Sequence, residues 1–278
     1  MLGKRGKAVR LIATLFCAVI GITMLLPLVW MISTSFKYES DVFVFPIQWI
    51  PERTVGFDNY KEVWGETYQF GLYYWNSIKI TVISTALQLI ISAMGAYGFT
   101  KIEFKGRNAL FLLYLATMMI PHQITIIPQF LVLKEMGLYN THTGIILMLT
   151  FSVYGVFLLR QNIMGLPNSL CEAAKIEGAG HIQIFCRIIL PLLKPAIATL
   201  AILKFVWTWN DYQTPLILLS SRELYTIQLG MKMFATESGS YYALIMAAAV
   251  SATIPLILLF LVGQKYVIEG IASGAVKG

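Results

Sequence analysis

The chain alternates long apolar stretches, free of Lys, Arg, Asp and Glu, with shorter segments in which those residues gather. A helix that crosses about 30 Å of hydrocarbon needs roughly 20 mainly apolar residues. Five stretches meet this requirement, and a sixth, between Lys194 and Arg222, is interrupted only by Lys204 and Asp211. The pattern predicts six membrane-spanning helices, at 11–33, 77–99, 109–131, 144–159, 196–216 and 243–262.

The composition agrees with a membrane protein. Hydrophobic residues form 57% of the chain and charged residues only 13%, whereas soluble domains carry about 25% charged residues. The chain therefore has too few charged residues to cover a water-facing surface of its size, although its net charge is +7. A disordered chain and a nucleic-acid-binding globule are both excluded. We predict an all-α polytopic membrane protein, with 1–278 forming a single transmembrane domain.

The distribution of basic residues predicts the orientation, because Lys and Arg accumulate in cytoplasmic loops. With six spans, thirteen of the 21 basic residues lie on the side of the two termini and six on the opposite side. The remaining two, Lys79 and Lys204, lie at or within spans. We expect a multi-pass protein with both termini in the cytoplasm.

Residues suited to metal or nucleotide chemistry do not form a recognisable site. The chain has no Gly-x-x-x-x-Gly-Lys-Ser/Thr phosphate loop, so we expect it to bind no ATP itself. The odd number of cysteines and the wide spacing of the histidines predict neither a disulfide framework nor a metal centre. These residues are Cys17, Cys171, Cys186, His122, His142 and His181. We therefore expect no cofactor, and no enzymatic reaction carried by this chain.

The segment 160–194, between the fourth and fifth predicted spans, is too polar to cross a membrane. Ser169-x-x-Glu172 has the pattern of a capping box, in which each side chain satisfies a backbone N–H at a helix start. Gly178 suits the helix end, because a left-handed conformation costs glycine little. The pattern predicts a short helix over 170–177, thin on one side, and a second amphipathic stretch from 181 that ends at Pro191.

This segment resembles the EAA loop of permease subunits from binding-protein-dependent ABC importers. The matching positions are Glu172, Ala173, Ala174, Gly178, Ile188, Leu190 and Pro191, in the same place between the fourth and fifth of six spans. The resemblance implies a coupling helix that docks into a cleft of a cytosolic ATPase. It assigns the ATPase contact to Glu172, Ala173, Ala174 and Gly178, and extends the coupling motif to Leu190 and Pro191.

Other segments are similar to the carbohydrate-uptake permeases of the maltose-transporter type. They are Phe45-Pro46, Trp49-Ile50-Pro51, Asn59-Tyr60, Ala96-Tyr97, Phe104-Lys105-Gly106-Arg107, Trp209-Asn210-Asp211-Tyr212, Pro215-Leu216 and the ending Ser273-Gly274-Ala275-Val276-Lys277-Gly278. The resemblance implies a core permease fold over about 72–264. It also implies that the tail, with Lys277 and Gly278, can approach the ATPase dimer interface. Lys204 departs from the pattern expected of the family.

Polar residues within spans are costly and suggest function. Lys204 and Asp211 are seven residues apart, too far for direct contact, so each needs another partner. Lys204 either snorkels or bonds a companion permease, or it lines the solute path. Asp211, with Asn210, is interpreted as a cap near the outer mouth rather than a sugar ligand.

Prolines interrupt the third predicted span. Pro121 and Pro128 each remove a backbone donor, and irregular backbone within a membrane is tolerated only beside protein or a watery cavity. The segment around His122 and Gln123 therefore either faces the translocation path or packs as a kink against neighbouring helices. The candidate pathway residues are Pro121, His122, Gln123, Lys204 and Asn210.

Together, these features predict one permease half of a sugar or oligosaccharide ABC importer in a bacterial inner membrane. The expected partners are a homologous permease, two cytosolic ATPase subunits, an extracytoplasmic sugar-binding protein and membrane lipid, with no nucleic acid. A near alternative is the same machine with a polyamine or glycerol phosphate as cargo. A more distant one is a secondary transporter without an ATPase, which leaves the predicted docking helix unexplained.

Overall fold

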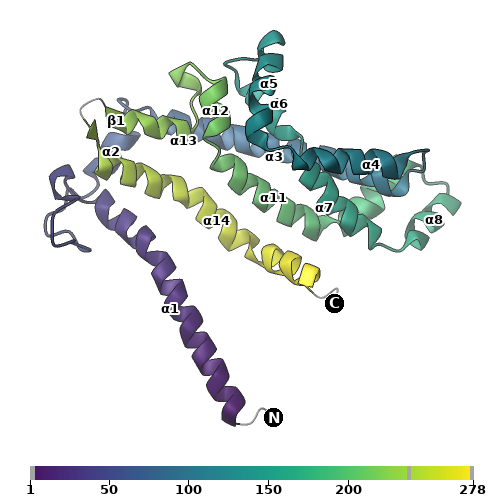
Figure 1. Cartoon of the computed structure of the whole chain (residues 1–278), viewed down its shortest axis with the longest axis horizontal. Coiled ribbons are helices and arrows are strands. Elements are labelled where there is room, and N and C mark those ends of the chain that lie inside the picture. The colour runs from purple at the N-terminus through teal and green to yellow at the C-terminus, as the bar shows by residue number, and fades with distance from the viewer. Residues whose placement is uncertain (1–3, 237–238, 276–278) are drawn as a thin grey trace. The chain divides into compact units, whose positions relative to one another are not determined.

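The computed structural model describes residues 4–236 and 239–275, almost all of them in helices (Figure 1). The long elements are α1 (Lys4–Ser35), α3 (Phe70–Lys101), α4 (Arg107–Ala116), α5 (His122–Glu135), α6 (His142–Thr150), α7 (Val153–Met164), α8 (Asn168–Ile176), α11 (Lys194–Trp209) and α14 (Tyr242–Ala275). Shorter helices are η1 (Glu39–Asp41), α2 (Asp58–Trp64), η2 (Thr117–Met119), α9 (His181–Ile184), η3 (Phe185–Ile189), α10 (Leu190–Leu192), α12 (Gln213–Leu218), η4 (Arg222–Leu224), α13 (Ile227–Gly230) and η5 (Met231–Phe234). A two-residue antiparallel pair joins β1 (Ala235–Thr236) to β2 (Gly239–Ser240).

Four segments are long and apolar enough to cross a membrane, and the number rises to six if each of two bent helix pairs counts as one span. The four are Val9–Ser35, Phe70–Lys101, His142–Met164 and Tyr242–Tyr266. The bent pairs are Arg107–Met119 with His122–Glu135, at 102°, and His181–Leu192 with Lys194–Trp209, at 74°. The predicted class of an all-α polytopic membrane protein is confirmed, while the count of six spans stays a prediction.

Breaks divide three of the predicted spans. The break in 109–131 falls at Ile120 and Pro121, where proline 121 precedes the first residue of α5. Pro128 was also predicted to interrupt this span, and here the prediction is wrong, because Pro128 lies inside α5. A proline within a helix removes one hydrogen bond, and the rest of the ladder can continue.

The other two breaks come without a proline at the break itself. The predicted span 144–159 is divided between α6 and α7 at Phe151 and Ser152. The predicted span 196–216 is divided between α11 and α12 at 210–212. Side chains adjacent to the breaks satisfy the new helix ends: the Ser152 hydroxyl accepts from the Gly155 N–H at 3.0 Å.

The chain forms two compact units. One comprises Met1–Gly71 and Met231–Ile254, and the other comprises Leu72–Gly230 and Pro255–Gly278. In the first unit, none of the apolar window of α1 is buried. A helix that is apolar on all sides is one that meets lipid or another protein around its whole circumference.

Polar contacts organise the loop that follows α1 in the first unit. The carboxylate of Glu39 accepts hydrogen bonds from the N–H groups of Tyr242 and Ala243, at 2.9 and 2.8 Å, and so caps the first turn of α14. Lys37 is fully buried, with its ammonium donating to the Gln48 carbonyl at 2.6 Å. Burial lowers the pKa of Lys37, while the nearby Asp41 carboxylate acts in the opposite direction.

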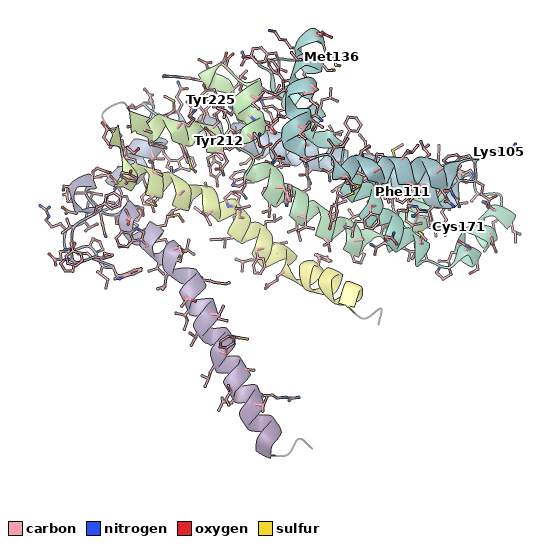
Figure 2. All side chains as sticks on the ribbon, in the orientation of Figure 1. Lys105, Phe111, Met136, Cys171, Tyr212 and Tyr225 are labelled. Atoms are coloured by element: carbon pink, nitrogen blue, oxygen red, sulfur yellow. The ribbon has the colours of Figure 1, made fainter. Side chains whose placement is uncertain are left out.

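One hydrophobic core cluster of the second unit lies where α3, α7, α8 and α11 meet. Its buried residues are Ala93, Ala96, Tyr97, Phe111, Val156, Leu159, Ile163, Cys171, Ala174, Ile184, Ile189, Leu193 and Leu200. Cys171 and Phe111 of this cluster are labelled in Figure 2. Gly155 allows a close approach of helices here, because a Cβ there would lie 2.5 Å from the Ser92 Oγ and 3.3 Å from Leu200 Cδ2.

We predict that Gly155→Val destabilises the protein by about 1–3 kcal/mol, because an added side chain overpacks this crossing of helices. The melting temperature of the detergent-purified chain should fall by several degrees. Gly98→Val is the matched control, since a Cβ at Gly98 in α3 meets nothing within 4 Å. Equal melting temperatures for the two variants would contradict the close packing at Gly155.

Candidate functional site

The helix predicted in the polar loop is present as α8, at the Lys101 end of α3 (Figure 1). It begins at Asn168, directly after Pro167, and no side chain caps it. The predicted capping box of Ser169 and Glu172 is therefore wrong, because both residues already lie inside the helix. Pro167 has no backbone N–H to donate, and its ring fixes φ, so it suits the position just before a helix.

The predicted stop at Gly178 is confirmed. Gly178 has φ +86°, a conformation that side chains with a Cβ rarely adopt. Its N–H donates to the Lys175 carbonyl at 3.0 Å, and the Ala179 N–H donates to the Ala174 carbonyl at 2.9 Å. This pair of bonds is a Schellman motif, which closes the helix and satisfies its last carbonyls.

The two faces of α8 differ sharply. Cys171 and Ala174 are buried in the core cluster, at 7% and 8% exposure. Glu172 and Ala173 are exposed on the other face, and Ile176 is 87% exposed. The two adjacent alanines therefore have different positions. Ala174 packs α8 against the core, and Ala173 keeps the exposed face of the helix thin.

Ile176 is a surface feature that the sequence analysis missed. An isoleucine with 87% exposure beside an exposed carboxylate is unusual on a polar loop. Ile182, at 80% exposure on α9, adds a second apolar side chain. The sequence does indicate this feature, because Ile176 and Ile182 are apolar residues that lie outside the apolar face by which the short helices pack.

The second stretch of the loop ends at Leu192, one residue beyond the predicted stop at Pro191. The helix runs from His181 to Leu192 through a π-helical segment, η3, before bending into α11. In η3 the Leu190 N–H donates to the Phe185 carbonyl, one residue further back than in an α-helix. This wider turn precedes Pro191, which lacks an N–H to continue the regular ladder. Leu190 packs against the core cluster, and Pro191 is exposed.

The structure gives Lys204 a partner within its own chain. The Lys204 ammonium donates to the carbonyl of Leu149 at 2.7 Å. Leu149 lies in the last turn of α6, where the break before α7 leaves carbonyls without helical N–H partners. Lys204 therefore caps the negative end of an interrupted helix.

Within residues 4–236 and 239–275, no hydrogen bond joins Lys204 to any of the other candidate pathway residues. Pro121, His122 and Gln123 are exposed at the start of α5. Asn210 is exposed, and its side-chain amide donates to the Val206 carbonyl at 2.8 Å. The Asp211 carboxylate accepts from the Thr214 N–H at 3.1 Å, which confirms its interpretation as a helix cap. Lys277 and Gly278 lie outside the described residues.

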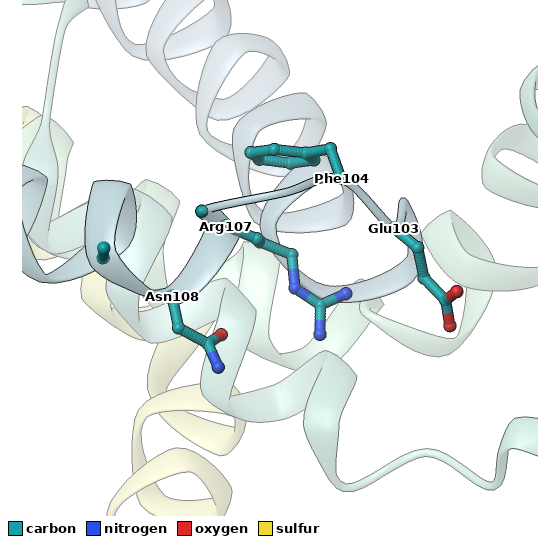
Figure 3. A pocket seen from close by; sticks show the side chains of 6 residues that line it. Glu103, Phe104, Arg107 and Asn108 are labelled. Carbon is teal, nitrogen blue, oxygen red and sulfur yellow. The ribbon is translucent and has the colours of Figure 1, made fainter.

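An open hollow of about 350 Å³ lies at the turn between α3 and α4 (Figure 3). It is lined by Glu103, Phe104, Gly106, Arg107, Asn108 and Ala109. The Arg107 guanidinium is already engaged, because it donates to the carbonyls of Thr100 and Ile102. The hollow is a consequence of the turn at Gly106, where φ is +81°, and it has no enclosed polar surface that would hold a solute.

Apolar helices that can span a membrane, with a short closed helix displayed between two of them, define the protein as an integral membrane protein. Residues 88–272 match the family model described as "Binding-protein-dependent transport system inner membrane component". The chain belongs to this family. Members of this family are transport components of the inner membrane that work with a substrate-binding protein.

Characterised relatives cover nearly the whole chain. The chain is 33% identical over 270 residues to the arabinooligosaccharides transport system permease protein AraQ of Bacillus subtilis, covering 97% of this chain and 96% of AraQ. It is 35% identical over 285 residues to the melibiose/raffinose/stachyose import permease protein MelC of the same organism, covering both chains fully. It is 32% identical to the lactose transport system permease protein LacG of Rhizobium radiobacter, covering 90% of each.

Solved structures show the same fold. One is a bacterial ABC transporter involved in import of the acidic polysaccharide alginate, with a TM-score of 0.84 and 25% identity, covering 96% of this chain and 99% of that one. Another is the alginate transporter in complex with a periplasmic protein bound to an alginate pentasaccharide, with a TM-score of 0.67 and 16% identity over 93% of each chain. The second resemblance concerns the fold alone.

We predict that Gly178→Val opens the end of α8. A β-branched residue at φ +86° is strained by about 1–3 kcal/mol, which would weaken both hydrogen bonds of the Schellman motif. Hydrogen exchange at the amides of 178 and 179 should accelerate at least about fivefold.

The matched control is Gly165→Val, at the end of α7, where φ is −77° and the nearest atom to an added Cβ is 3.4 Å away. Exchange at 178 and 179 should be unchanged in that variant. Unchanged exchange in Gly178→Val as well would show that the left-handed glycine does not secure the helix end.

Proposed function

We propose that this chain is the permease subunit of an ATP-driven importer for neutral oligosaccharides, with α8 as its coupling helix. The observation that carries the proposal is the construction of α8. It is closed by Gly178, seated on the core through Ala174, and displays Glu172, Ala173 and Ile176. A closed helix with a thin outward face suits insertion into a groove of a partner protein.

The partner that binds α8 is proposed to be a cytosolic ATPase. Glu172 supplies charge for recognition, Ala173 permits close approach, and Ile176 supplies an exposed apolar contact. Ala174, Gly178, Leu190 and Pro191 shape and seat the coupling segment. The tail residues Lys277 and Gly278 are proposed to reach the same ATPase assembly.

The complete transporter is proposed to contain a homologous permease, two ATPase subunits and an extracytoplasmic sugar-binding protein. The loops that carry most Lys and Arg face the cytoplasm, as do both termini, and 1–278 acts as one permease domain with its core over about 72–264. The exposed apolar surface of α1 provides area for lipid and for the companion permease.

The cargo is proposed to be a neutral oligosaccharide because AraQ, MelC and LacG are named for such sugars. The solute path is assigned to the interrupted spans, with Pro121, His122, Gln123, Lys204 and Asn210 along it, since broken backbone at depth needs protein or water beside it. Lys204 already donates to the Leu149 carbonyl, which gives it a role other than binding an anion.

Transport is proposed to follow alternating access. Closure of the ATPases on ATP displaces the docked α8 helices, and the two permeases change from an outward-open to an inward-open state. A ligand can drive such a change only through different affinities for the two states. ATP and the binding protein supply that difference, while this chain transmits it without catalysing a reaction.

The test is Glu172→Lys in the complete transporter reconstituted in liposomes. Because reversal of a charge at an interface opposes docking, ATP-dependent uptake should fall at least about tenfold while the chain still inserts and folds. Uptake is measured for raffinose, an arabinose oligosaccharide, spermidine and glycerol 3-phosphate. Wild-type transporter should import one of the two sugars.

Glu135→Lys is the matched control, an exposed charge reversal at the end of α5, and should leave uptake unchanged. Wild-type uptake by Glu172→Lys would overturn the assigned role of α8. Import of spermidine or glycerol 3-phosphate, with neither sugar taken up, would overturn the assigned cargo. Full uptake without any ATPase would overturn the class of transporter.

A further inference from the structure

Tyr97 of α3 makes a polar contact with the segment that follows the coupling helix. Its hydroxyl lies 3.0 Å from Nδ1 of His181, the first residue of α9. In the tautomer with Nε2 protonated, the Tyr97 hydroxyl donates this hydrogen bond. Tyr97 is 6% exposed and belongs to the same buried cluster as Cys171 and Ala174 of α8.

Ring contacts strengthen the same junction. The Tyr97 and His181 rings have centroids 6.2 Å apart in an edge-on arrangement, and the Tyr97 and Phe185 centroids are 5.3 Å apart. Such aromatic pairs stabilise a contact beyond the area that they bury. The Tyr97 ring therefore packs against α9 and η3 while its hydroxyl fixes the position of the α9 start.

One helical turn further along α3, a second bond holds the start of α8. The Lys101 ammonium donates to the Asn168 side-chain oxygen at 2.7 Å. One rigid helix thus contacts the first residues of both α8 and α9. A displacement of the segment 168–184 has to move α3 or break these contacts.

The opposite end of α3 is fixed just as closely. The Asn76 side-chain amide donates to the carbonyls of Glu223 and Tyr225, at 2.8 and 3.0 Å, and the Ser77 hydroxyl accepts from the Ile227 N–H at 2.8 Å. At 1.5 Å per residue, the helix path from Asn76 to Tyr97 is about 31 Å. This distance is about the thickness of the hydrocarbon layer.

We propose that Tyr97 and His181 are positioning residues that join the coupling segment to α3, so that movement of α8 and α9 is carried along α3 to 223–227. The inference rests on the proposed function of α8. Both ends of α3 are bonded, and the helix between them has no break. It is therefore a contiguous rigid element that links the two sites physically.

The test uses the complete transporter in liposomes, with whichever sugar of the panel above the wild type imports. The readout is the number of sugar molecules imported per ATP hydrolysed, together with the melting temperature. Tyr97→Phe keeps the packed ring and removes the hydroxyl, so this ratio should fall about fivefold while the amount of assembled transporter stays close to wild type. A purely structural role would lower the amount of assembled transporter and leave the ratio unchanged.

Four further variants isolate the bond. Tyr114→Phe removes a half-buried hydroxyl that makes no hydrogen bond in the described part of the chain, and should leave the ratio unchanged. His181→Ala should match Tyr97→Phe, and the double variant should be no worse than either single one. His181→Asn, which offers a polar side chain again, should recover part of the ratio.

A wild-type ratio in Tyr97→Phe, or additive losses in the double variant, would overturn the inference. If Tyr97→Phe does not assemble, His181→Ala decides, because the His181 side chain is exposed and its removal leaves the core intact. Loss of coupling in Glu172→Lys with a normal ratio in Tyr97→Phe and His181→Ala would remove this inference alone. Wild-type uptake in Glu172→Lys would remove the proposed function beneath it.

Discussion

A helix that ends inside a membrane must find partners for its last carbonyls and first N–H groups, because hydrocarbon offers none. The division of 144–159 into α6 and α7 shows how this chain meets that constraint. The Lys204 ammonium caps a carbonyl in the last turn of α6, and the Ser152 hydroxyl caps the first turn of α7. A lysine that is costly in an intact apolar helix thus becomes useful beside an interrupted one.

The same constraint separates what the sequence could predict from what it could not. Charge-free runs locate the apolar segments, and Pro121 marks a break, because both signals are local. The break at Phe151 and Ser152 lacks a proline or glycine, and its one local sign is a serine ahead of an apolar run. The Leu149 partner of Lys204 is 55 residues away in the chain, so no local pattern indicates it.

The polar loop over 160–194 is predictable to a similar extent. Gly178 was identified because a left-handed helix end needs glycine, and the backbone there has the expected angle. The start is misplaced because Ser169 and Glu172 match a capping pattern, whereas the position just before the helix is occupied by Pro167, two residues earlier. Which alanine faces inward depends on the position of α3, and only the structure shows that Ala174 is buried.

The burial of Ala174 bears on why the loop carries two adjacent alanines. Neighbouring residues on a helix point about 100° apart, so one small side chain cannot serve both the core and the outer surface. Ala174 lets α8 lie close to the cluster around Tyr97, and Ala173 keeps the exposed face low beside Glu172. A larger residue at 174 would push α8 away from α3 and lengthen the Tyr97 and Lys101 contacts. The loop is therefore constrained from within the chain as well as by any partner that binds it.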